Sequence, residues 1–224
     1  MENNKCFTCV DCSVKKCSTG KNKYPSFCVS KTLSKEEVDE SKKNYLDDEE
    51  NLKIARASAE IEADFYCRAS RVEETIRWAK KLGAKKIGIV TCVGLIDESR
   101  VLAGLLRDYG FEVFGVGCKV GEVAKEEIGI EKRCNVTGNN MCNPIIQAKL
   151  LNKEKTDINI VMGLCVGHDS LFYKYSEAIT TTLVVKDRLL GNNPVAALNN
   201  IKSYYKYLRE LKFDDELENK TTEI

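Results

Sequence analysis

The chain has 224 residues, of which 43% are hydrophobic and 31% are charged, as is typical of one globular domain with a smaller segment attached. Its net charge is +1, from 35 basic and 34 acidic residues, so the composition offers no basic surplus for binding nucleic acid. No run of about 18 apolar residues predicts a transmembrane helix. The first residues lack the apolar core of a secretory signal. We therefore expect a cytoplasmic protein whose partners are neither nucleic acids nor membranes.

Eleven cysteines are the most informative feature of the composition. An odd number argues against a complete set of disulfides, and the reducing cytoplasm keeps thiols free. In that compartment, clustered cysteines are typical of metal binding or of redox chemistry. The sequence therefore predicts metal ions as partners, with a redox partner protein or a small anionic ligand as further candidates.

The first cysteine cluster lies in residues 1–33, which we interpret as a Cys-rich metal-binding module. The segment has too few large apolar residues for a core of its own, so a bound metal would have to hold it together. Its five cysteines are separated by two, two, four and ten residues, which is typical of a tetrahedral zinc site or of an iron–sulfur cluster. Cys6 lies nearest the free end and is the spare thiol. The predicted ligands are Cys9, Cys12, Cys17 and Cys28.

Residues 34–69 are predicted to form a long helical connector. Ser34 and Glu37 have the pattern of a capping box, and no glycine or proline interrupts the segment. Ser70 and Glu73 have the same pattern, so we predict that the next helix begins there.

Residues 70–213 change to strands that alternate with helices. Four apolar stretches have the length and composition of buried strands, and they are 85–92, 111–118, 158–165 and 180–187. This alternation predicts right-handed crossovers. We therefore expect a Rossmann-like α/β domain, with a doubly wound, mainly parallel four-stranded sheet and flanking helices. Residues 214–224 form an acidic tail.

The predicted helices of this domain have recognisable starts. Asp97 is expected to cap the first, and Asn143 with Pro144 to open the second. Asn193 is expected to open a final helix that packs through an apolar stripe including Val195 and Leu198.

A second cysteine cluster follows from this topology. Cys92, Cys118 and Cys165 each lie at the end of a predicted strand, and carboxyl ends of parallel strands share one edge. If the first strand lies between the second and the third, neighbouring strand ends are about 5 Å apart. Cys142 precedes the helix that leaves this edge, and His168, the only histidine, follows Cys165. The predicted site, a second metal centre or a reactive-thiol set, comprises Cys92, Cys118, Cys142, Cys165 and His168.

The helix starts on this edge add partial positive charge, which favours thiolates and small anions. We predict Asn143 and Asn193 as positions that contact a bound cofactor. Lys186 and Arg188 follow the fourth strand and are interpreted as surface charges.

Several stretches carry a resemblance: the N-terminal cysteine cluster, ENLKIARASAEIEADFY, RVEETIRWAKKLGAKKIGIVTCVGL, MCNPIIQAKLLNKEKTDINIVMGLCVGHDSLF and VVKDRLLGNNPVAAL. Together they cover nearly the whole chain, and it resembles an uncharacterised prokaryotic family of predicted metal-binding proteins, the domain of unknown function 1847. The resemblance implies a cytosolic protein with a Cys-ligated metal site on Cys9, Cys12, Cys17 and Cys28. Family members usually carry proline after the last of these, whereas this chain has Val29.

Three hypotheses about function remain open. The first is a redox or electron-transfer protein with an N-terminal iron–sulfur or zinc site and a second Cys site at the sheet edge. The second is a non-enzymatic metal carrier or sensor. The third is an enzyme that acts on a small anionic substrate, with His168 as acid or base. Cys67 and Cys134 fit none of these and are interpreted as structural or incidental.

Overall fold

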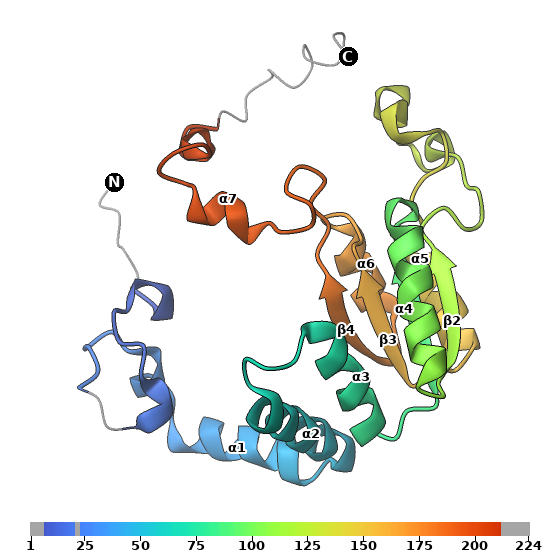
Figure 1. Ribbon diagram of the computed structural model, residues 1–224. Coiled ribbons are helices and arrows are strands. Elements are labelled where there is room, and N and C mark those ends of the chain that lie inside the picture. The colour runs from blue at the N-terminus through green and yellow to red at the C-terminus, as the bar shows by residue number, and fades with distance from the viewer. Residues whose placement is uncertain (1–6, 21–22, 212–224) are drawn as a thin grey trace. The chain divides into compact units, whose positions relative to one another are not determined.

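The computed structural model describes residues 7–20 and 23–211, and it divides the chain into two compact units, residues 1–62 and 63–224 (Figure 1). The helices are α1 (Lys35–Leu46), α2 (Glu49–Phe65), α3 (Arg71–Lys81), α4 (Ile96–Asp108), α5 (Pro144–Lys153), α6 (His168–Tyr175) and α7 (Val195–Asn199). The strands are β1 (Lys86–Thr91), β2 (Glu112–Gly117), β3 (Ile158–Met162) and β4 (Ile179–Val184). Among these residues, no helix has both the length and the apolar character needed to cross a membrane.

The first unit carries short 3-10 turns followed by α1 and most of α2. The predicted capping box is present, because Glu37 N–H donates to Ser34 Oγ at 3.1 Å and Ser34 N–H donates to the Glu37 carboxylate at 2.7 Å. The sequence predicted one uninterrupted helix, but the structure has two helices, because the helical conformation is interrupted between α1 and α2. There Asp48 Oδ1 accepts a hydrogen bond from the backbone N–H of Asn51. An aspartate that caps a new helix therefore ends the old one without any glycine or proline.

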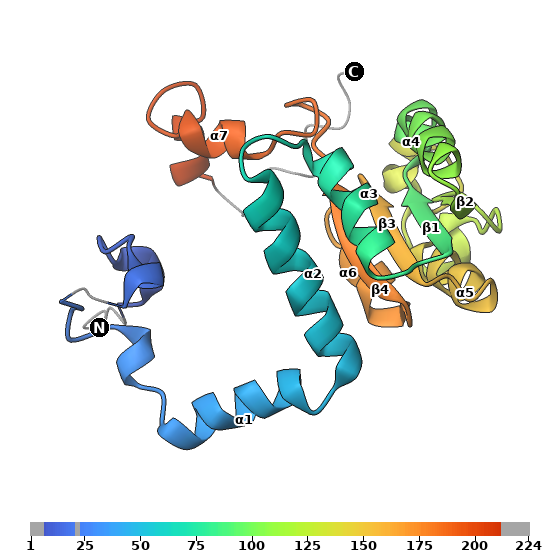
Figure 2. The ribbon, with the colours of Figure 1, turned by 60° about the horizontal axis from the view of Figure 1, so that its bottom comes forward.

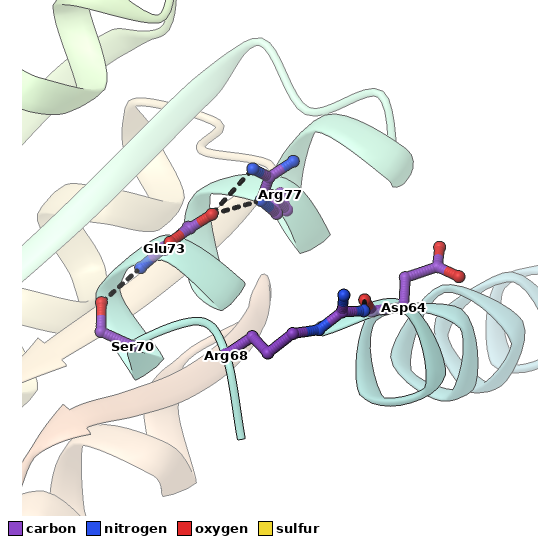
Figure 3. A network of polar contacts seen from close by, with 5 residues as sticks. All are labelled: Asp64, Arg68, Ser70, Glu73 and Arg77. Atoms are coloured by element: carbon purple, nitrogen blue, oxygen red, sulfur yellow. Dashed lines mark hydrogen bonds and ion pairs between the residues drawn. The ribbon is translucent and has the colours of Figure 1, made fainter. Parts of the chain in front are cut away.

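Polar contacts on both sides of the connection between α2 and α3 involve the residues drawn in Figure 3. The Arg68 guanidinium donates to the backbone carbonyl of Asp64 at the end of α2. Ser70 Oγ accepts from the backbone N–H of Glu73 at 3.3 Å and so caps α3. The Glu73 carboxylate pairs with Arg77 at 2.7 Å rather than with the backbone of the cap. The predicted Ser70 cap is thus confirmed, while the reciprocal half of the box is replaced by an ion pair.

The second unit contains a four-stranded sheet with the order β2-β1-β3-β4 and parallel pairing throughout. The predicted α/β fold is confirmed, including the position of the first strand between the second and the third. β1 pairs with β2 from Lys86 opposite Glu112 to Thr91 opposite Gly117. All four strands therefore end at one edge of the sheet.

Helices cover both faces of this sheet. On one face α3 and α4 pack on β1 and β3, where Leu106 and Ile160 are fully buried. On the other face α5 and α6 pack on the sheet through Leu151 and Phe172, which are also fully buried. Figure 2 shows α4 and α5 on opposite sides of β1 and β2. This arrangement is the predicted doubly wound sheet, with an apolar core on each of its faces.

The segment after β4 differs from its prediction. The expected final helix is only α7, which ends at Asn199, and turns with one short 3-10 helix follow. Val195 is 52% exposed and Leu198 is 66% exposed, so the expectation of a packed apolar stripe is wrong. The pair Asn199-Asn200 lies where the helix stops, and asparagine favours turns over helix interiors because its side chain competes for backbone hydrogen bonds.

Candidate functional site

The carboxyl edge of the sheet gathers the four predicted thiols. Cys92 directly follows β1, Cys118 directly follows β2, and Cys165 lies in the loop between β3 and α6. Cys142 lies just before α5, which leaves from the same edge, and His168 is the first residue of α6. The register of β1 and β2 places the first two thiols on neighbouring strands.

Cys118 and Cys142 lie in direct contact. Their sulfur atoms are 3.7 Å apart. The backbone N–H of Asn143 donates to the Cys118 carbonyl at 2.8 Å and holds the start of α5 against the end of β2. The N–H of Val93 donates to the Cys118 sulfur at 3.4 Å. Cys118 is only 2% exposed, whereas Cys142 is partly exposed.

Hydrogen bonding distributes charge unevenly over three of the thiols. The bond with Cys118 is the main cause that lowers the pKa of Cys92 to about 5, with help from the charge of Lys186. The bonds with Cys118 and then His168 lower the pKa of Cys142 to about 4. The pKa of Cys118 is raised by its bonds with Cys142 and Cys92 and by burial. These hydrogen bonds therefore favour the thiolate form of Cys92 and of Cys142, one on each side of the Cys118 thiol.

His168 completes this chain of contacts. Its hydrogen bond with Cys142 raises the pKa of the imidazole, and burial opposes that rise. The backbone N–H of His168 donates to the carbonyl of Cys165 at 2.9 Å, so the imidazole and the fourth thiol belong to one turn. An imidazole beside a thiolate can stabilise its charge or supply a proton to a leaving group.

Positive side chains face the thiols. Arg188 donates to the Cys165 sulfur at 2.8 Å, and burial raises the pKa of Cys165 while Arg188 offsets part of that rise. Lys186 acts on Cys92, and Lys119 acts on Cys142. Arg188 is exposed and Lys186 is partly buried, as surface charges are, but both also act on thiols of the edge, because their positive charge favours the thiolate form of Cys165 and Cys92.

Gln147 supports the site and was not predicted. This side chain on α5 is fully buried, and its amide nitrogen donates to the carbonyls of Thr91 at 3.1 Å and Val116 at 2.8 Å. Those carbonyls lie at the ends of β1 and β2, next to Cys92 and close to Cys118. The one sequence signal was a polar residue within the otherwise apolar face of α5. Its Oε1 is buried without a hydrogen-bond partner among the described residues.

Of the three helix starts predicted at this edge, the structure contains the Asn143 cap, whereas Asp97 and Asn193 do not cap their helices, since Pro194 occupies the cap position of α7. Asn143 Oδ1 accepts from the backbone N–H of Ile146 at 3.0 Å, and Pro144 is the first residue of α5, as expected. Asp97 does not cap α4, because a 3-10 turn leads into that helix and Leu95 occupies the cap position. Asp97 instead pairs with Arg100 in the first turn.

Asn193 lies at a different part of the edge. It precedes α7 and lines a hollow of about 640 Å³ beside the end of β4, together with Arg71 and Glu98. Arg71 is already engaged there, since its guanidinium donates to the carbonyl of Thr182 at 2.9 Å. The role of Asn193 in contacting a cofactor stays a prediction.

The N-terminal ligands predicted from spacing lie on three short turns. Cys9 is the first residue of the first turn, and its carbonyl accepts a hydrogen bond from the backbone N–H of Cys12 at 3.2 Å. Cys17 begins the second turn and Cys28 caps the third. Cys6 lies outside the described residues. Within residues 7–20 and 23–211, no three His, Cys, Asp or Glu side chains are arranged to hold a metal ion as they stand.

The two remaining thiols stand apart from this chain of hydrogen bonds. Cys67 is exposed in the connection between α2 and α3 and has a positive φ of 54°. Cys134 is partly exposed, and its carbonyl accepts from the ammonium of Lys125 at 2.5 Å. Both residues serve below as controls.

The fold and the edge define an α/β protein with a doubly wound parallel sheet and a cluster of thiols at its carboxyl edge. The model of the family described as a protein of unknown function (DUF1847) matches residues 28–183, and the chain belongs to this family. An uncharacterized protein of Methanocaldococcus jannaschii, MJ0455, is 45% identical over 204 residues, which cover 91% of this chain and 99% of that protein.

Solved structures give a weaker similarity. A crystal structure of Dph2 from Pyrococcus horikoshii with a 4Fe-4S cluster matches with a TM-score of 0.35 and 21% identity over 64% of this chain. A second Dph2 structure from the same organism matches with a TM-score of 0.32 and 19% identity over 63% of this chain. The matched region spans about a third of the length of those proteins, 34% and 33%. A TM-score of this size does not establish a common fold.

Proposed function

We propose that this protein is a Cys-ligated metal-binding protein whose principal site is the thiol cluster at the carboxyl edge of the sheet. The observation that carries the proposal is the pair of sulfur atoms of Cys118 and Cys142, 3.7 Å apart on two different elements. Two thiolates on one tetrahedral ion with bonds of about 2.3 Å are about 3.8 Å apart. The pair thus has the spacing of two ligands on a single ion.

The donor set around this pair fits a metal. Cys92 contacts Cys118 on one side and His168 contacts Cys142 on the other, so three sulfurs and one imidazole nitrogen form a continuous series. Lowered pKa values favour the thiolate form that binds metals. A bound Zn²⁺ would serve as a Lewis acid, or as a structural ion if all four positions were filled.

The N-terminal cysteines are the second part of the proposal. Their spacing supports an iron–sulfur cluster or a zinc ion on Cys9, Cys12, Cys17 and Cys28. With iron at the N-terminal site, the protein would transfer electrons, and the thiol edge would be the second redox centre. With zinc alone, the N-terminal cysteines would form a structural site, or the protein would act as a metal carrier or sensor if that zinc exchanges readily. Metal identity therefore decides between these roles.

Metal analysis of the full chain tests the proposal. The protein is purified without oxygen, and zinc, iron and acid-labile sulfide are measured per chain. Single serine substitutions of Cys118 and Cys142 are expected to lose about one equivalent of metal, or one cluster, since each removes a ligand. Cys67→Ser and Cys134→Ser are the controls and should keep the wild-type content. The double variant Cys9→Ser/Cys12→Ser reports on the N-terminal site separately.

The opposite result is equally clear. If the serine variants at Cys92, Cys118, Cys142 and Cys165 all retain the metal content of the wild type, the edge binds no metal. If the Cys9→Ser/Cys12→Ser variant then loses all metal, the protein is a metal-binding protein through its N-terminal cysteines alone.

A further inference from the structure

The thiol pair at the edge has a property beyond metal binding. Cys118 and Cys142 come from the end of β2 and the approach to α5, and their sulfur atoms are 3.7 Å apart. A disulfide has a sulfur–sulfur bond of about 2.05 Å, so closure requires an approach of only about 1.7 Å. The hydrogen bond from Asn143 N–H to the Cys118 carbonyl, 2.8 Å long, already fixes the two backbones beside each other.

We propose that Cys118 and Cys142 are a redox-active dithiol that closes to a disulfide by exchange with a small-molecule disulfide such as oxidised glutathione. Closure itself rests on the geometry of the two thiols. Its consequence, loss of two metal ligands at once, rests on the function proposed above.

The difference in exposure sets the order of events. Cys142 is partly exposed and Cys118 is 2% exposed, so the oxidant meets Cys142 first. The Cys142 thiolate attacks one sulfur of oxidised glutathione, a mixed disulfide forms, and one glutathione thiolate leaves. Cys118 then loses its proton to water, and its thiolate attacks the Cys142 sulfur and expels the second glutathione thiolate. Two protein thiols and one oxidised glutathione thus become one protein disulfide and two reduced glutathiones.

The surroundings of the pair favour this order. The buried sulfur of Cys118 receives the N–H of Val93 at 3.4 Å, which holds it in place behind Cys142. Cys67 is exposed and does not belong to the series of hydrogen-bonded thiols at the edge. With no second thiol to attack it, Cys67 should remain a mixed disulfide with glutathione.

The test uses the full-length chain, reduced and freed of metal with a chelator, then treated with oxidised glutathione and digested under non-reducing conditions. Trypsin gives peptides 108–119 and 134–149, which carry Cys118 and Cys142. Because the second peptide also contains Cys134, the experiment is repeated in Cys134→Ser. A cross-linked peptide pair, lighter by two hydrogens and present in both proteins, is the expected result.

Two substitutions test the order. Cys118→Ser should stop at Cys142 with one glutathione attached, because the resolving thiol is missing. Cys142→Ser should leave Cys118 unmodified while Cys67 still gains glutathione. The proposal is overturned if Cys118 and Cys142 both stay free in the wild type, or if each carries its own glutathione. It is also overturned if Cys118 reacts as fast in Cys142→Ser as Cys142 does in Cys118→Ser.

A last measurement separates this inference from the metal proposal. Zinc is added to the reduced and to the oxidised chain. Loss of about one equivalent of bound zinc on oxidation, restored by a reductant, supports both. If the disulfide forms but the reduced chain binds no metal at the edge, the proposal of a redox-active dithiol is supported and the proposal of a metal site at the edge is refuted.

Discussion

Gln147→Met is the substitution that best separates the support of the thiol site from the stability of the fold. Methionine has nearly the volume of glutamine and remains in the apolar face of α5, so the packing against the sheet is retained. The change removes the two hydrogen bonds from the Gln147 amide to the carbonyls of Thr91 and Val116. It also removes an Oε1 atom that is buried without a partner within the described residues.

The magnitude follows from these three groups. Each buried carbonyl left without its donor costs about 1–3 kcal/mol, and removal of the orphaned Oε1 returns a similar amount. The net loss of unfolding free energy is therefore about 1–3 kcal/mol. Urea unfolding followed by circular dichroism measures it.

The substitution should increase local opening around Cys118 by more than it lowers the global stability of the fold. Gln147 joins α5 to the ends of β1 and β2, so its loss frees the backbone next to Cys118. Hydrogen exchange of the Asn143 amide, which donates to the Cys118 carbonyl, should accelerate by more than the global loss of stability explains. Alkylation of buried Cys118 under native conditions should accelerate with it.

Asn159→Leu is the matched control. Asn159 is also fully buried; it accepts from Thr156 Oγ1 at 2.8 Å and donates to Ser176 Oγ at 2.9 Å. It lies near the start of β3, at the opposite end of the strand from the thiols. A comparable loss of global stability is expected, with no extra exposure of Cys118. Equal protection of Cys118 in both variants would refute the supporting role of Gln147.

Three further predictions concern pH, packing and a buried charge. The folded pKa values of Cys92 and Cys142, about 5 and about 4, lie below that of an unfolded thiol, so the unfolded chain binds more protons at these two positions between about pH 5 and 8. The raised pKa of His168 opposes this effect above about pH 6.5, but it is one group against two, so the unfolding free energy of the metal-free protein should rise with pH across that window. Urea titrations at several pH values check this slope, and a flat profile would contradict it. Gly88→Ala should lower the unfolding free energy by about 1–3 kcal/mol, because the added Cβ would overlap the side-chain oxygen of Asn159 in β3 and a methyl group of Leu151 in α5. Gly94→Ala is the control, since its added Cβ would make only ordinary contacts, and its melting temperature should change little. Lys125→Met should lower the unfolding free energy by about 2–5 kcal/mol, because the ammonium of Lys125 donates to three oxygens in the segment between β2 and α5; an unchanged denaturation midpoint would show that these bonds contribute little.

Much of the sheet was predictable because its signals are local and consistent. Buried strands read as apolar runs, and the Asn143–Pro144 pair marks a helix start by chemistry that needs no tertiary contact. Once four strands alternate with helices, right-handed crossovers restrict the topology to a few choices. The convergence of thiols on one edge follows from that topology, since each of Cys92, Cys118 and Cys165 follows a strand.

What could not be predicted depends on competition between elements. Asp48 starts a new helix inside a segment with no breaker, which propensity alone does not reveal. The contact between Arg188 and Cys165 depends on the path of the loop after β4, and the sequence pattern does not predict that path. Gln147 is a polar residue on the apolar face of α5, and its role is evident only when the strand carbonyls that accept its hydrogen bonds are known. Polar residues that break a local rule are thus where the structure added most to the site.

The segment between Cys118 and Cys142 leaves the sheet and returns to nearly the same point. Its base is held by the Asn143–Cys118 hydrogen bond and, a few residues further out, by Lys125 N–H to Asn139 O at 3.0 Å. A loop with clamped ends transmits little strain to them, and doubling its length costs only about 0.6 kcal/mol in closure entropy. A change in length within residues 126–133, outside the contacts that the Lys125 ammonium makes, would therefore cost little. It would leave the distance of 3.7 Å between the two sulfur atoms unchanged.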